Sequence, residues 1–140
     1  MSSKLGISNL VEDAEEGETF FGDIFAGLHP TMEVNDIVIA ADQELERGAG
    51  LGLISADENP NKGKYKLWDI YSSDGSEELA GILGCYVDAT TQDGKGFMYV
   101  HGEFLKDSLF AAHPIVSGVY NNGAIVIKEE IHDDSNDQYV

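Results

Sequence analysis

The chain has 140 residues, 42% of them hydrophobic, and its 26 acidic against 8 basic residues give a formal net charge of −18. This size fits one domain with its own core, and the negative field repels phosphate backbones, which argues against direct nucleic-acid binding. A single cysteine, Cys85, excludes disulfide scaffolds and zinc ribbons, and no apolar run approaches the roughly 20 residues of a membrane helix.

The two ends of the chain are the most acidic parts. Eleven acidic residues and no basic one lie between Lys4 and Arg47, and five more acidic residues follow Lys128. This distribution is typical of a solubilising, self-repelling surface rather than of a specific cation site. The N-terminus has no apolar run followed by a small-residue cleavage site, so we expect no secretory signal and a protein that stays in the cytosol that makes it.

Residues 1–18 are predicted to form a flexible arm. Ser, Gly, Asn and five acids surround a few apolar residues there, without the period of a helix or a strand. We expect a domain over residues 19–132 and a short acidic tail over 133–140. The apolar residues of the arm are Leu5, Ile7, Leu10 and Val11.

The segment 20–28 is apolar and has two interpretations. Phe20, Ile24 and Leu28 recur every four residues, as on one face of a helix, but two glycines weaken that helix and His29-Pro30 ends it. The segment either lies on the core of its own domain or offers an apolar patch to another subunit. The candidate patch consists of Phe20, Phe21, Ile24, Phe25 and Leu28.

From residue 34 onward, short β-type runs alternate with Gly, Asn, Asp and Pro, which is typical of a loop-rich β domain. The expected strands are 34–41, 51–54, 64–71, 79–87, 97–104 with a break at Gly102, and 124–131. One helix is plausible in this part, over 105–112, with a cap at Asp107 or Ser108 and a stop at His113-Pro114. The sequence therefore predicts a mainly β single domain with one or two short helices.

A search for catalytic, cofactor and metal sites finds no convincing constellation. The glycines of 48–52 lack the following helix that a phosphate loop needs, the four histidines have no i, i+4 pair, and the tail has only half of a calcium loop's spacing. Cys85 lies in an apolar run with no neighbouring base, which favours an inert, buried thiol. We therefore predict a protein that is not an enzyme, with no catalytic residue, no cofactor and no metal site.

The β runs and turns form an ordered series with compatible spacing over about two thirds of the chain. No single piece is specific to one family; Asp-Gly-Ser, for example, is common. The order and spacing of the pieces together are specific. The series consists of 35–42, 50–54, 64–68, 74–76, 80–83, 87–90, 100–104, Leu109 and 123–127. It resembles the lambda-type head decoration protein family of tailed bacteriophages.

This resemblance implies a small β-rich domain of the phage head decoration type with a flexible N-terminal arm. It implies a cement protein that binds the exterior of the expanded head as a homotrimer at three-fold and quasi-three-fold positions, with the phage major capsid protein as partner. Its implied location is the outer surface of the virion, after synthesis in the host cytoplasm. The arm would order on the capsid, and its candidate contacts are Lys4, Leu5, Ile7, Leu10 and Val11.

Two other classes of function compete with this interpretation. An acidic protein can mimic DNA and occupy a host nucleic-acid-binding protein, in which case its grip should weaken steeply with salt. A sugar- or ligand-binding β domain would need a pocket around Trp68 and Tyr86, although aromatic residues at strand spacing are more often part of a core.

Overall fold

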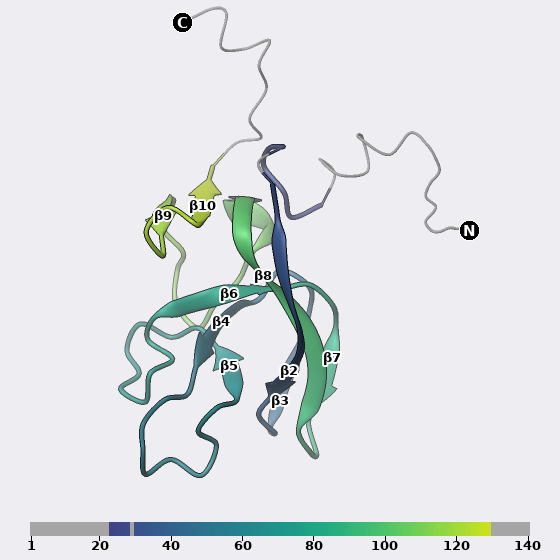
Figure 1. The fold of residues 1–140 in the computed structure, drawn as a ribbon, viewed down its shortest axis with the longest axis vertical. Coiled ribbons are helices and arrows are strands. Elements are labelled where there is room, and N and C mark those ends of the chain that lie inside the picture. The colour runs from purple at the N-terminus through teal and green to yellow at the C-terminus, as the bar shows by residue number, and fades with distance from the viewer. Residues whose placement is uncertain (1–22, 29, 130–140) are drawn as a thin grey trace, which may run out of the picture.

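The structure, a computed structural model, describes residues 23–28 and 30–129 (Figure 1). The helical structure within these residues is one 3-10 turn, Lys106–Ser108, and no helix among them has the length and apolar character to cross a membrane. The strands are β2 (Met32–Ile39), β3 (Gln43–Leu45), β4 (Gly50–Leu53), β5 (Tyr65–Leu67), β6 (Leu79–Leu83), β7 (Val87–Ala89), β8 (Gly94–Leu105), β9 (Gly118–Tyr120) and β10 (Ile125–Lys128).

Five strands close into a small barrel. The seven-stranded sheet has the order β2-β5-β4-β6-β8-β10-β9, and an additional pairing of β2 with β8 closes the ring β2-β5-β4-β6-β8. We call these five strands the closed barrel. Strand β8 continues past the ring, where β10 pairs with it in parallel and β9 pairs with β10 (Figure 1). We call residues 23–28 and 109–128, which lie on this extension, the appended end.

The apolar side chains form two clusters because successive residues of a strand point to opposite faces of the sheet. In β6, Ile82 belongs to one cluster and the next residue, Leu83, belongs to the other. The barrel cluster comprises Ile37, Ile39, Leu45, Ala49, Leu51, Leu83, Val87, Ala89 and Met98. The end cluster comprises Ile24, Phe25, Trp68, Leu79, Ile82, Tyr99, Phe104, Leu109, Ile125 and Ile127.

The mainly β class predicted from the sequence is confirmed, with differences in the strands. The run at 79–87 is two strands, β6 and β7, which pair with different partners, and β8 runs through Gly102 without a break. The short strands β3 and β9 were not predicted. Three residues show little alternation, and the equally short β5 and β7 were found only because they overlap the longer predicted runs 64–71 and 79–87.

The helix predicted over 105–112 is wrong beyond the single turn at Lys106–Ser108. Leu109 packs in the end cluster, whereas Phe110 packs against the barrel cluster and forms a bridge with Ala49. The amide of Gly50 also donates to the carbonyl of Phe110 at 2.8 Å. The backbone of Leu109 is extended, with φ −109° and ψ 160°, so the helix ends before it and the side chains of Leu109 and Phe110 point to different clusters.

Candidate functional site

The chain enters the described domain along the second half of β8. The amide of Ala26 donates to the carbonyl of Glu103 at 2.9 Å, the amide of Leu105 donates to the carbonyl of Ile24 at 2.7 Å, and Phe25 forms an antiparallel bridge with Phe104. These bonds fix the backbone of the entry segment beside the barrel. The point at which residues 1–22 join the domain is therefore set by main-chain pairing.

Arg47 holds the same segment through its side chain. Its Nε donates to Asp23 at 2.6 Å, a second guanidinium nitrogen donates to the carbonyl of Gly84 at 2.6 Å, and the guanidinium carbon lies 5.8 Å from the ring centre of Phe25 and 5.6 Å from that of Tyr99. Burial alone would lower the pKa of Arg47, but the hydrogen bonds to Asp23 and Tyr99 outweigh it and raise the pKa. The guanidinium thus stays charged while it joins the entry segment to the barrel.

The structure separates the two interpretations of the segment 20–28 for the residues that it describes. Ile24 and Phe25 are 2% and 4% exposed and pack in the end cluster, so both lie on the core of their own domain rather than on a free surface. Leu28 is 70% exposed, and a contact of Leu28 with another subunit stays a prediction. Residues 23–28 do not form a helix, and Phe25 pairs as a β-bridge. Phe20, Phe21 and the arm residues Lys4, Leu5, Ile7, Leu10 and Val11 lie outside the described residues.

The first half of β2 is an exposed strand edge. Residues 32–34 pair with β8 on one side, whereas β5 reaches β2 only at Ile39, so the other side of 32–36 has no strand partner in the part of the chain that the structure describes. Met32 and Val34 are exposed there. An unpaired edge with exposed apolar residues can accept a strand from another chain.

The Asp-Gly-Ser turn, residues 74–76, is held by hydrogen bonds and an ion pair of Asp74, which we call the Asp74 network. The carboxylate of Asp74 accepts hydrogen bonds from the hydroxyls of Ser72 and Ser76 at 2.8 and 2.6 Å and pairs with Lys66 at 2.9 Å. Burial would raise the pKa of Asp74, but the hydrogen bonds from Ser76, Lys66 and Ser72 outweigh it and hold the pKa well below its usual range. Ser76 is fully buried, and its backbone lies so close to Gly52 that a β-carbon there would meet it at 2.4 Å.

Trp68 and Tyr86, the two aromatic residues considered for a ligand pocket, lie in different environments. Trp68 is buried in the end cluster, and its indole N–H donates to the carbonyl of Glu77 at 3.0 Å. Tyr86 is half exposed and donates to Glu44, which raises the pKa of Tyr86 to about 12. The structure therefore gives no support to a shared pocket around Trp68 and Tyr86.

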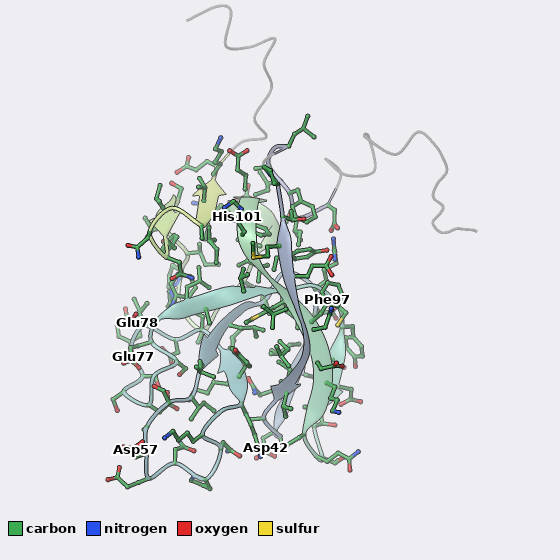
Figure 2. All side chains as sticks on the ribbon, in the orientation of Figure 1. Asp42, Asp57, Glu77, Glu78, Phe97 and His101 are labelled. Carbon is green, nitrogen blue, oxygen red and sulfur yellow. The ribbon has the colours of Figure 1, made fainter. Side chains whose placement is uncertain are left out.

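The described residues also bring no metal-binding group together: among residues 23–28 and 30–129 there is no cluster of three His, Cys, Asp or Glu side chains. The side chains of Asp57 and Glu78 are exposed and point outward in Figure 2, whereas the carboxylate of Glu77 accepts a hydrogen bond from the amide of Gly75. Cys85 is a free, half-buried thiol. What the sequence search missed is the pairing of Asp23 with Arg47, whose only signal was an isolated arginine after a long acidic stretch.

The comparisons with known proteins give one family match, which covers most of the chain. The family model of bacteriophage lambda head decoration protein D matches residues 15–114, and a comparison with curated proteins finds no match. The matched range includes the entry segment, the closed barrel and the Asp-Gly-Ser turn, whereas the piece at 123–127 lies beyond it. Because the match spans well over half of the chain, this protein belongs to the bacteriophage lambda head decoration protein D family, a family of structural capsid components.

Proposed function

We propose that this chain is a cement protein that binds the exterior of the expanded phage head as a homotrimer at three-fold and quasi-three-fold positions. The observation that carries the proposal is the family match over residues 15–114. The partner is the phage major capsid protein, and the protein is made in the host cytoplasm before it joins the outer surface of the virion.

The physical basis of this function is thermodynamic linkage. A ligand that binds only the expanded lattice stabilises that lattice, by about 2.7 kcal/mol per site when its free concentration is one hundred times Kd. No bond is made or broken, so the function requires no catalytic group. The three subunits of a trimer bind as one unit, so contacts that are weak singly combine through a high effective concentration.

Two features support a role for the N-terminal region in this binding. Residues 1–18 combine apolar with acidic side chains, and the arm contacts proposed are Lys4, Leu5, Ile7, Leu10 and Val11. Residues 23–26 are joined to the domain by the hydrogen bond of Asp23 with Arg47 and by backbone pairing with β8. A contact between the arm and the capsid would therefore be connected to the barrel by these bonds.

The test is co-sedimentation of the purified full chain with compact precursor shells and with expanded heads of its own phage, at low and high salt. We expect stoichiometric binding to expanded heads alone, and we expect most of it to survive high salt because apolar and main-chain contacts are weakly screened. Deletion of residues 1–18 should leave a folded domain with greatly weakened binding. Absence of binding to either particle would overturn the proposal, and salt-sensitive capture of a basic DNA-binding protein instead would favour the DNA mimic.

A further inference from the structure

The turn between β9 and β10 contains the one Asn-Gly pair of the chain, Asn122-Gly123. In such a pair the main-chain nitrogen of the second residue can reach the side-chain carbonyl carbon of the first, because glycine has no β-carbon to obstruct the approach. Whether the pair reacts depends on the exposure and the hydrogen bonds of its two residues, and these are properties of the fold.

Asn122 is open to solvent and unrestrained. It is exposed, and its side chain has no hydrogen-bond partner in the part of the chain that the structure describes. The φ of Asn122 is +58°, and those of Asn121 and Gly123 are also positive. Two main-chain bonds hold the turn: the amides of Gly123 and Ala124 donate to the carbonyls of Tyr120 and Asn121, both at 3.2 Å, the long end of the usual range.

Strand β9 gives this turn little support. It has three residues, and its strand partner among residues 23–28 and 30–129 is β10 alone. An edge of this kind opens locally at a small cost in free energy, so the amide of Gly123 is released from Tyr120 far more often than the whole domain unfolds. The reaction needs this opening, because the attacking nitrogen must give up its hydrogen bond.

The two Asp-Gly pairs of the chain are restrained in ways that Asn122 is not. The carboxylate of Asp74 is bound by Lys66 and by two serine hydroxyls. Asp93 pairs with Lys64 at 2.7 Å and also accepts a backbone amide at 3.0 Å. An ionised carboxylate is, in addition, a poorer target for a nitrogen nucleophile than a neutral amide.

Other asparagines in turns have occupied side chains or an obstructed neighbour. Oδ1 of Asn59 accepts from the amide of Asn61 at 2.8 Å, and Oδ1 of Asn61 accepts from a lysine ammonium at 3.2 Å. Asn59 also precedes Pro60, whose nitrogen carries no hydrogen. Asn121 is exposed, has a φ of +56° and has no side-chain partner among the described residues, but the residue after it is Asn122, which has a β-carbon.

We propose that Asn122 is a site of spontaneous deamidation, which converts it to aspartate and isoaspartate. The main-chain nitrogen of Gly123 bonds to Cγ of Asn122, the bond from Cγ to the side-chain nitrogen breaks, and ammonia leaves with the proton of the Gly123 amide. Water then adds to either carbonyl of the cyclic succinimide and opens it. Overall the residue takes up water and releases ammonia, with no oxidant or reductant.

Both products change the surface of the appended end. Each places a carboxylate in the run 108–127, which contains no Asp, Glu, Lys or Arg. In isoaspartate the main chain also passes through the side-chain carboxyl carbon, which lengthens the turn and should loosen the pairing of Val119 with Val126. The inference concerns the chemical state of the chain and does not depend on the proposed function.

The test is incubation of the purified full chain in warm, mildly alkaline buffer, followed by proteolytic mapping with mass spectrometry and an enzymatic assay for isoaspartate. We expect conversion at Asn122 to precede that at every other Asn or Asp of the described residues and to yield both products. It should become faster as the pH rises, because the attacking amide must lose its proton. Asn121, in the same turn, should react several-fold more slowly.

Gly123→Ala tests the access of the attacking nitrogen. A β-carbon at Gly123 would meet no atom within 4 Å, so the domain should keep its melting curve, whereas the φ of +93° strains an alanine and favours opening of the turn. A several-fold slower reaction at Asn122 would therefore reflect obstruction and not a tighter turn. Gly63→Ala is the matched control, because Gly63 has a φ of +92° and equally open surroundings in another turn, and it should leave the rate unchanged.

Three results would overturn the inference. The first is an Asn122 that stays intact in the native chain while it reacts in urea, because the turn would then protect it. The second is an equal rate at Asn121 and Asn122. The third is a Gly123→Ala protein that reacts as fast as the wild type. Loss of binding to heads would bear on the proposed function and not on this reaction.

Discussion

The closed barrel and the appended end both bury apolar residues, but they differ in the ion pairs and the exposed apolar side chains on their surfaces. Around the barrel, ion pairs join Lys64 to Asp93 and Lys66 to Asp74, and the hydroxyl of Ser76 is bound by the same Asp74. In the appended end, residues 109–127 include no charged residue, and Val116 and Val119 are exposed. Satisfied polar groups gain little from a partner, whereas exposed apolar area gains free energy when it is covered. The barrel therefore provides the scaffold, and contact surfaces are to be sought at the appended end and along the edge of β2.

The largest effect is expected from a change inside the barrel. Gly81 pairs with Leu51, and a β-carbon at Gly81 would lie 2.6 Å from the sulfur of Met98 and 2.9 Å from the carbonyl oxygen of Tyr99. We expect Gly81→Val to cost about 3 kcal/mol or more of the free energy of unfolding, because the overlap includes backbone. Urea unfolding measures this cost. Ala80→Val is the matched control, since Ala80 is half exposed in the same strand, and equal stability of the two variants would contradict the close approach.

The second largest loss of stability is expected from a change in the Asp74 network. Asp74→Asn removes the ion pair with Lys66 and the negative charge of the carboxylate that accepts hydrogen bonds from the two serine hydroxyls. We therefore expect the free energy of unfolding to fall by about 2 kcal/mol. Asp57→Asn is the control, because the side chain of Asp57 is 85% exposed and its ion pair with Lys62 is open to solvent. Equal stability of the two variants would show that the Asp74 network contributes no more to stability than a surface ion pair does.

The stability difference between the wild type and Asp74→Asn is expected to depend on pH. Because the pKa of Asp74 is held below its usual range, its contribution is fully present above the unfolded-state pKa, about 3.9, and is lost as the pH falls through the lower folded-state pKa. The difference in free energy of unfolding between the wild type and Asp74→Asn should therefore be constant near neutral pH and shrink below about pH 4. A difference that stays constant down to pH 2.5 would mean that the stabilisation does not depend on the charge of Asp74.

A smaller effect is expected where the appended end joins the barrel. Arg47→Lys keeps the positive charge but loses the planar fork that reaches both Asp23 and the carbonyl of Gly84, so we expect a cost of about 1 to 2 kcal/mol. The loss should be local, and hydrogen exchange should quicken at the amides of Ala26 and Leu105, which pair the entry segment with β8. Unchanged exchange at both amides would show that Arg47 does not hold the segment.

The smallest effect is expected at the surface of the barrel. Lys62 pairs with Asp57 at 2.6 Å, but the two side chains are 54% and 85% exposed. Lys62→Gln should change the free energy of unfolding by no more than about 0.5 kcal/mol, because solvent and entropy offset an exposed ion pair. A loss near that of Asp74→Asn would show that the exposed ion pair contributes as much as the partly buried pair of Lys66 with Asp74.

Much of the fold follows from local sequence patterns. The runs at 34–41, 51–54 and 124–131 overlap β2, β4 and β10, since apolar residues between turn signals are reliable where a strand has four residues or more. The helix over 105–112 failed because Leu109 and Phe110 are drawn to different clusters, which no local pattern reveals. Of the candidate site residues, Ile24 and Phe25 are part of the core. The sequence could not show this, because apolar residues alone do not distinguish a buried segment from an exposed patch.

Residue types and their local order were enough to predict the β class, the resemblance to the family carried by the ordered pieces, and the strongly acidic charge. The folded chain was needed to show that β2 closes on β8, that Arg47 holds the entry segment, and that Val116 and Val119 of the uncharged run are exposed. The first two of these join residues far apart in the chain. Long-range contacts are selected by how well whole elements pack together, and a local pattern of residues does not contain that information.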